Sequence, residues 1–327
     1  MGKLIEGQWR TETWLRDNTG HFKRDPTTFR HFVKSDGSTP FAPEAGRYHL
    51  YVSLACPWAH RTLIVRAMRG LEEAISVSVV HHFMGEDGWY FGECEGCTPD
   101  EVLGKKYLRD VYTEADSGYT GRVTVPILWD RKQGTIVNNE SREIVRMFNT
   151  EFGELATTDL DLYPEPYQDV IDETIDAIYE PVNNGVYRAG FATTQEAYEE
   201  AYDELFGALD HWERELSNKR YLCGQAFTEA DIFMFTTLLR FDPVYYSHFK
   251  CNKRRISDYP NLWNYLKEIY SLDGIAETSN LTHIKNHYYG SHETINPTRI
   301  VPKGPVLALD TPHDRERLPG EVHRFNR

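Results

Sequence analysis

The chain has 327 residues, 40% of them hydrophobic and 26% charged, and its formal net charge is −14 at pH 7. This composition is typical of a soluble globular protein of two domains, and the acidic balance disfavours nucleic acid as a partner because phosphates repel carboxylates. No apolar stretch approaches the roughly 20 residues that a membrane-spanning helix needs, so we expect no membrane partner.

The N-terminus predicts neither secretion nor a separate domain. Its first residues lack the apolar core of a secretory signal. Five cysteines are an odd, sparse set for this length, which favours a reducing compartment, the cytoplasm, over a disulfide framework. Residues 1–44 are polar and irregular, with scattered aromatic side chains, and are predicted to be an ordered extension that wraps over the rest of the protein.

The next segment alternates between strand and helix patterns. A strand is predicted at 49–53, a helix at 57–70 and a second strand at 75–80. Strand, helix and strand in one compact stretch indicate a parallel βαβ unit. A long insertion, 82–121, is rich in Gly, Asp and Tyr, and loops of such length are usually functional or disordered.

A β-hairpin and a helix complete this first domain. Apolar runs at 124–130 and 135–137 flank a polar, Gly-containing turn, and Asn138-Asn139-Glu140-Ser141 opens a helix with plausible capping residues. The order β-α-β, then β-β-α, matches the thioredoxin fold. That fold carries a cis-proline where Pro126 heads the third strand. We therefore assign 45–153 to an α/β thioredoxin-like domain.

Beyond about residue 155 the strand signals stop. Thr228-Glu229-Ala230-Asp231 is a variant of the capping box that starts many helices. We expect an all-α domain over 154–295 and an extended, proline-containing C-terminal arm over 296–327. Helical periodicity is found in the segments 170–179, 195–216, 228–239 and 261–270.

Cys56 stands at the junction between the first strand and the first helix. Unpaired N–H groups and the positive end of the helix dipole favour an anion there, so this thiol should be a stronger acid than free cysteine. Pro57 suits the first helical turn because it has no N–H to leave unsatisfied. The alternative is a buried packing cysteine, and this local pattern alone does not decide between the two. His60 is expected on the helix surface.

Cys94 and Cys97 have the Cys-x-x-Cys spacing of redox or zinc sites. No second pair accompanies them, and a structural zinc usually needs four ligands. In the sequence only His81 and His82 could complete a set. We therefore predict no metal, and we expect Cys223 and Cys251 to be packing residues.

A thioredoxin-like domain followed by a helical domain is the plan of the soluble glutathione transferases. The chain resembles their Xi class, also called glutathionyl-hydroquinone reductases, from about Trp9 to Pro305. The matching runs are Cys56-Pro57-Trp58-Ala59, Gly121-Arg122-Val123-Thr124-Val125-Pro126, Ile136-Val137-Asn138-Asn139-Glu140-Ser141, Val182-Asn183-Asn184-Gly185-Val186-Tyr187-Arg188, Thr228-Glu229-Ala230-Asp231, His248-Phe249-Lys250-Cys251-Asn252 and His283-Ile284-Lys285-Asn286-His287-Tyr288-Tyr289.

The resemblance implies reduction of a glutathionyl-hydroquinone to the hydroquinone. Cys56 would form a mixed disulfide with glutathione, and a second glutathione would release oxidised glutathione. Glutathione is then a co-substrate, no cofactor is bound permanently, and a homodimer is expected. Alternatives are a conjugating or deglutathionylating glutathione transferase, for which Ser or Tyr at position 56 would suit conjugation, and a non-catalytic ligand-binding protein on the same scaffold.

The resemblance also implies a glutathione site in the first domain. Glu140 and Ser141 begin a helix that can hold the γ-glutamyl end. Val125 would offer its backbone to the cysteinyl part, Arg122 would meet the glycyl carboxylate, and Trp89 would contact glutathione from the insertion. Without a ligand role Glu140 and Ser141 would be a helix cap, Arg122 a solvated surface charge and Trp89 an apolar anchor of its loop.

Tyrosines match the family's hydroquinone site. Tyr187 and Tyr288 correspond to the tyrosines that lie over the aromatic ring, where a phenol can give a proton to the leaving carbon. The alternative is aromatic core packing, the commonest role of tyrosines in helical domains.

Overall fold

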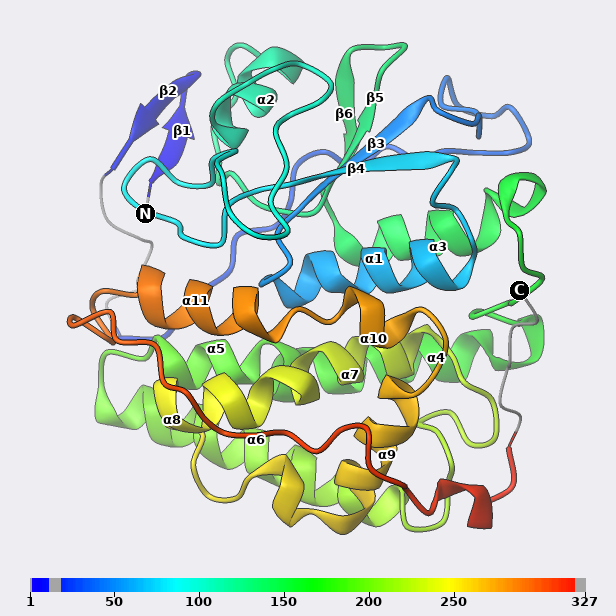
Figure 1. Cartoon of the computed structure of the whole chain (residues 1–327), viewed down its shortest axis with the longest axis vertical. Coiled ribbons are helices and arrows are strands. Elements are labelled where there is room, and N and C mark those ends of the chain that lie inside the picture. Colours follow the sequence, from blue (N-terminus) through cyan, green and yellow to red (C-terminus); the bar gives the residue numbers. More distant parts are fainter. Residues whose placement is uncertain (1, 12–18, 321–327) are drawn as a thin grey trace. The chain divides into compact units, whose positions relative to one another are not determined.

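The computed structural model describes residues 2–11 and 19–320. Residues 12–18 of the expected extension and 321–327 of the expected arm lie outside the described residues. The chain divides into two compact units, each built from separate stretches of sequence (Figure 1). Their described residues are 2–11, Arg24–Leu160 and Thr278–His292 in unit 1, and 19–23, Asp161–Glu277 and 293–320 in unit 2.

Unit 1 contains a four-stranded mixed sheet in the order β4-β3-β5-β6. β3 runs parallel to β4 and antiparallel to β5, and β5 and β6 form an antiparallel hairpin. This is the thioredoxin-like arrangement that the sequence predicts. The strands are β3 (Tyr48–Val52), β4 (Ile75–Val79), β5 (Ile127–Asp130) and β6 (Thr135–Asn138).

Two helices, α1 (Pro57–Met68) and α3 (Ser141–Thr150), pack against each other on one side of this sheet (Figure 1). Nine of the twelve residues of α1 are buried, so this helix is covered on more than one face. The insertion contains a helix that the sequence does not predict, α2 (Leu108–Ala115).

The N-terminal stretch of unit 1 is tied to the sheet by backbone hydrogen bonds. The hairpin of β1 (Lys3–Ile5) and β2 (Gln8–Arg10) connects to the end of the insertion, where Leu4 N–H donates to the Gly121 carbonyl at 2.9 Å. Further along, the His31 N–H donates to the carbonyl of Val137 in β6 at 2.9 Å.

Unit 2 is all helical apart from its turns and extended segments. Every residue of α7 is buried, and Thr228 with Asp231 forms the capping box that the sequence predicts. The helices are α4 (Gln168–Ile178), α5 (Gly185–Gly190), α6 (Gln195–Glu215), α7 (Glu229–Arg240), α8 (Tyr246–His248), α9 (Pro260–Tyr270) and the short α10 (Ile275–Thr278), whose last residue falls in unit 1. Among the described residues, no helix is both long and apolar enough to cross a bilayer.

The division of the chain differs from the expected one at α11 (Leu281–Ser291). This helix follows the helices of unit 2 in the sequence but belongs to unit 1, whereas the sequence places it within a helical domain at 154–295. The reason is a row of contacts with the insertion. The His287 Nδ1 lies 2.8 Å from the His82 carbonyl, and the Ser291 hydroxyl accepts from the Met84 N–H at 2.9 Å.

The described part of the C-terminal arm belongs to unit 2. Its Arg315 side chain is fully buried and donates to the carbonyls of Leu216 and Arg220 at 2.6 and 2.7 Å. Polar groups that lie away from water need such partners, so this arginine fastens the arm to the loop after α6.

Candidate active site

Cys56 is the N-cap residue of α1, with φ −76° and ψ 123°. Its thiol is half-buried, and Sγ lies 3.7 Å from the carbonyl oxygen of Val125. The peptide bond between Val125 and Pro126 is cis. Unit 1 therefore brings the sulfur, which the sequence already places at a helix start, next to the backbone before the cis-proline.

Cys94 and Cys97 form a disulfide, and the two remaining cysteines differ from Cys56 in their burial. Cys223 and Cys251 are buried in unit 2. Burial raises the pKa of the Cys223 thiol to about 11 and raises that of Cys251 further. Both remain thiols at neutral pH, in agreement with their expected packing role.

The second part of the candidate site is the start of α3. Glu140 is its N-cap residue, and its Oε1 accepts from the Arg142 N–H at 3.3 Å. The Thr27 hydroxyl, from the N-terminal stretch, donates to Oε2 at 3.3 Å. Ser141 is buried beside it. The capping alternative is thus realised in the structure, and the contact of these residues with a γ-glutamyl group stays a prediction.

Arg122 lies in a cationic part of unit 1. Burial lowers the pKa of its guanidinium to about 10, and the positive charge of Arg24 acts in the same direction while Asp25 opposes it. The guanidinium carbon of Arg24 lies 4.9 Å from the centroid of the Trp58 ring, and that of Arg61 lies 4.4 Å from it. A site in which neighbouring cations repel one another is suited to an anionic ligand.

The structure shows Trp89 in its anchoring role. Its ring stacks on His287 of α11, with centroids 4.7 Å apart, and the residue is buried. Tyr288, the next residue on α11, is 1% exposed and lies edge-on to the ring of His292 at 5.4 Å. Contacts of Trp89 with glutathione and of Tyr288 with a hydroquinone remain predictions.

Tyr187 lies on α5 in unit 2. It is buried in an aromatic cluster, 5.6 Å from the Phe249 ring and 6.0 Å from the Tyr245 ring between centroids. Phe22, from the short N-terminal stretch of unit 2, stacks on it at 6.4 Å. The packing alternative is therefore realised for this residue.

The expectation that His60 lies on the helix surface is wrong. His60 is 1% exposed, and its Nε2 lies 3.0 Å from the hydroxyl of Thr278 just before α11. His60 is buried because α1 also meets the chain that leads to α11. Sequence reasoning missed this contact, because nothing local to His60 signals it.

Sequence reasoning also missed Arg24 and Thr27 as neighbours of the site. Arg24 and Thr27 lie in the N-terminal stretch, which has no motif and no periodicity. The one available signal was Trp58 itself, since it directly follows Cys56-Pro57 and offers an aromatic face on which arginine stacks well.

Two family models match the chain. One, described as "Glutathione S-transferase, N-terminal domain", covers residues 55–151, and the other, "Glutathione S-transferase, C-terminal domain", covers residues 195–268.

Curated proteins match nearly the whole chain. Glutathionyl-hydroquinone reductase YqjG of Escherichia coli is 53% identical over 325 residues, which cover 97% of this chain and 99% of that protein. Glutathionyl-hydroquinone reductase PcpF of Sphingobium chlorophenolicum is 50% identical over 311 residues, 94% of this chain and 98% of its own.

Solved structures agree with these matches. A Xi-class glutathione transferase from Natrialba magadii superimposes with a TM-score of 0.94 at 57% identity, over 98% of both chains. The glutathione-bound structure of YqjG from Escherichia coli superimposes with a TM-score of 0.89 at 52% identity, over 96% of this chain and 99% of that one.

Proposed function

Since the chain belongs to the Xi class of the glutathione S-transferase family, we propose that it reduces glutathionyl-hydroquinones to hydroquinones with glutathione. Relatives at 50–53% identity over nearly their full length carry the name glutathionyl-hydroquinone reductase. The observation that carries the proposal is the half-buried Cys56 sulfur at the start of α1, 3.7 Å from the Val125 carbonyl. A sulfur there can do disulfide chemistry that a hydroxyl cannot.

The reaction proceeds in two thiol steps. The Cys56 thiolate, favoured by the helix start, attacks the glutathionyl sulfur and forms an S–S bond as the bond from that sulfur to the aromatic carbon breaks. The electron pair leaves with the carbon, which takes a proton and becomes the free hydroquinone. A second glutathione thiolate then attacks the mixed disulfide and releases oxidised glutathione and the Cys56 thiolate.

Glutathione is held along unit 1 at both of its ends. The Ser141 hydroxyl and the N–H groups at the start of α3 receive the γ-glutamyl carboxylate, and Glu140 pairs with the ammonium. The Val125 backbone meets the cysteinyl part beside Cys56. Arg122 receives the glycyl carboxylate, which is supported by its cationic surroundings.

The aromatic part of the substrate is served by tyrosine hydroxyls. Tyr288 supplies the proton to the leaving carbon, with Tyr187 as the second hydroxyl donor of the hydroquinone site. Trp89 contacts glutathione from the insertion and also anchors α11, and its stacking on His287 supports the second of these roles. We further propose that the protein acts as a cytoplasmic homodimer with glutathione as its co-substrate and no permanently bound cofactor.

Intact mass and peptide mapping after incubation with oxidised glutathione test the proposal. We expect one glutathione adduct on Cys56, removed by dithiothreitol and absent from Cys56→Ala. Turnover of a glutathionyl-hydroquinone should be lost in the same variant. Cys223→Ser is the matched control, because its raised thiol pKa keeps it unreactive, and it should keep the parent's adduct and rate.

Two outcomes contradict the proposal. One is a Cys56→Ala protein that reduces the substrate at the parent's rate. The other is a Cys56→Ser protein with full reductase activity, since serine can assist conjugation but cannot form the mixed disulfide. Conjugating activity that survives in Cys56→Ser while reduction is absent from the parent would favour an ordinary transferase.

A further inference from the structure

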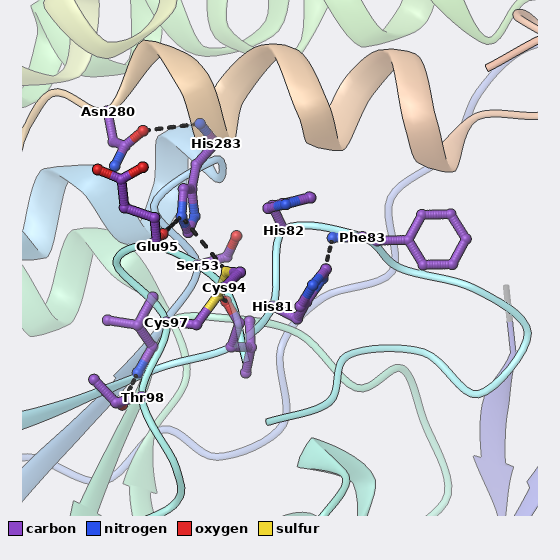
Figure 2. The surroundings of a disulfide bond; sticks show 12 residues. Ser53, His81, His82, Phe83, Cys94, Glu95, Cys97, Thr98, Asn280 and His283 are labelled. Carbon is purple, nitrogen blue, oxygen red and sulfur yellow. Dashed lines mark hydrogen bonds between the residues drawn. A yellow bond between two sulfur atoms is a disulfide. The ribbon is translucent and has the colours of Figure 1, made fainter. Parts of the chain in front are cut away.

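A second sulfur centre lies in unit 1, in the insertion. Cys94 and Cys97 form a disulfide with Cα atoms 5.1 Å apart (Figure 2). Gly96 between them has φ +78°, which favours glycine and turns the backbone so tightly that the Cys97 N–H donates to the Cys94 carbonyl at 3.0 Å. The turn therefore presents both sulfurs from one short loop.

The fold adds a ligand that the sequence does not place near this pair. His283 comes from the first turn of α11, and its Nε2 lies 3.8 Å from the Cys94 sulfur (Figure 2). The helix cap holds it there, since Asn280 accepts from the His283 N–H at 2.8 Å. The sequence predicts no metal at Cys94 and Cys97, because only His81 and His82 could complete a set of ligands, and His283 is a further ligand beside them.

These residues form a compact set of donor atoms. The ligand atoms of Cys94, Cys97 and His283 lie within 4.8 Å of one another, and those of His81, His82 and Cys94 do the same. Around a tetrahedral zinc ion, with bonds of roughly 2.0–2.3 Å, donors lie about 3.3–3.8 Å apart. Once the disulfide is open, movements of about 1 Å would bring the atoms of each set to that spacing.

The buried Nδ1 of His82, an imidazole nitrogen of this set, has no hydrogen-bond partner. His283 is 2% exposed and faces the Cys94 sulfur through its Nε2, while its Nδ1, which also has no hydrogen-bond partner, can carry the ring proton when Nε2 binds a metal. The two rings are edge to face, 5.3 Å apart between centroids. His81 is less available, because its Nδ1 accepts from the Phe83 N–H at 2.9 Å.

We propose that reduction of the Cys94–Cys97 disulfide creates a binding site for one thiophilic divalent cation, held by Cys94, Cys97, His283 and His82. Two thiolates and two imidazoles in tetrahedral arrangement suit zinc. The site is separate from the Cys56 chemistry and does not depend on the proposed reductase activity.

Reduction of the disulfide and binding of zinc balance in electrons and protons. Two molecules of a thiol such as glutathione give up two electrons and two protons to the disulfide, which yields two cysteine thiols and one oxidised thiol. Zinc then displaces the two thiol protons as it binds the sulfurs. The His283 Nε2–H donates to the Glu95 carbonyl at 2.6 Å. On metal binding this hydrogen bond is given up and the ring proton moves to Nδ1, so that the neutral imidazole offers its Nε2 lone pair to the metal. Glu95 lies between the cysteines, so its carbonyl can move with the opened turn.

Cobalt titration of the full chain tests the site. The protein is reduced with a phosphine, freed of metal and reductant under nitrogen, and titrated with Co²⁺, whose absorption reports tetrahedral thiolate ligation. We expect one Co²⁺ per chain, displaced by Zn²⁺, and no such absorption in the protein whose disulfide is intact. Intact mass before and after reduction verifies the redox state.

Substituted proteins show whether Co²⁺ binds at this site or at other thiols. Cys97→Ser and His82→Asn should each weaken Co²⁺ binding more than about 100-fold, because loss of a mere second-shell partner already costs 10- to 100-fold. Cys56→Ser, Cys223→Ser and His81→Asn should bind Co²⁺ as the parent does. Far-UV circular dichroism checks that each variant is folded.

Three results would overturn the inference: no thiolate-to-cobalt absorption in the reduced parent, equal absorption with the disulfide intact, or retention of binding in Cys97→Ser. The comparison of the reduced with the oxidised parent needs no variant, so the test holds even if a substitution prevents folding.

Discussion

At the scale of single residues, the environment of Arg122 supports the proposal that this residue receives the glycyl carboxylate. Burial and the charge of Arg24 both act against its protonated form, lowering its pKa to about 10, although it remains charged at neutral pH. Arg24 and Arg61 are both spread over the Trp58 ring. A carboxylate that enters this region relieves the repulsion between cations, so its binding gains more than one pairwise contact.

Replacement of Arg122 by Gln should weaken glutathione binding without stopping the chemistry. A hydrogen bond to a charged group contributes about 1.5–3 kcal/mol, which corresponds to an increase in the KM for glutathione of about 10- to 100-fold. The glycyl carboxylate is remote from the reacting sulfur, so kcat at saturation should change little. Steady-state kinetics measure both, with the exposed Arg10→Gln as control. A variant with the parent's KM would show that Arg122 is only a structural charge.

At the scale of elements, helix α7 illustrates how a buried helix start is kept satisfied. Asp231 is fully buried, and burial raises its pKa to about 6. Its Oδ1 accepts from the Leu222 N–H at 2.9 Å and from the Tyr265 hydroxyl at 2.7 Å, while Oδ2 accepts from the Thr228 N–H at 2.9 Å. One carboxylate thus joins the loop before α7, the helix itself and α9.

Replacement of Asp231 by Ala should destabilise unit 2 strongly. It leaves three buried donors without an acceptor, each at a cost of about 1–3 kcal/mol, and removal of a poorly solvated charge offsets part of this. We expect a net loss of about 3 kcal/mol or more in the free energy of unfolding, measured by urea denaturation. The exposed Asp203→Ala on α6 should change it by less than about 0.5 kcal/mol. Equal midpoints for the two variants would contradict the role of the cap.

At the scale of the whole molecule, both units bury histidines in the neutral state. His49 in unit 1 and His248 in unit 2 have their pKa lowered from 6.5 to about 4, mainly by burial and further by the neighbouring cations Arg131 and Lys250. Below pH 6.5 the unfolded chain binds protons at these positions while the folded units do not, so stability falls as the pH falls from about 6.5 towards 4. Asp231 acts in the opposite direction, because its raised pKa lets the folded state hold a proton that the unfolded chain releases.

A pH series of urea denaturation should show this loss, and His49→Gln should make it shallower. The variant removes up to one proton from the difference between the unfolded and folded states. His211→Asn, at an exposed position on α6, should keep the parent's slope. A His49→Gln protein that loses stability between pH 6.5 and 4 as steeply as the parent would exclude His49 as a source of the pH dependence.

The sequence alone determined the features that depend on neighbours along the chain. The order of strands and helices, Cys56 at a helix start, Pro126 at the head of a strand and the capping box at Asp231 all follow from local spacing and from proline or capping chemistry. The helix α2 escaped prediction because its eight residues are too short for a clear period and Tyr107 before it gives no side-chain cap.

Only the tertiary structure decided which distant segments meet. It placed α11 with unit 1, brought Arg24 to Arg122, and set His283 against the sulfur of Cys94. These contacts join residues far apart in the chain, and the free energy that selects them comes from burial and hydrogen bonding over a whole surface. No local pattern of residues carries that information, because the partner of each group is supplied by another part of the fold.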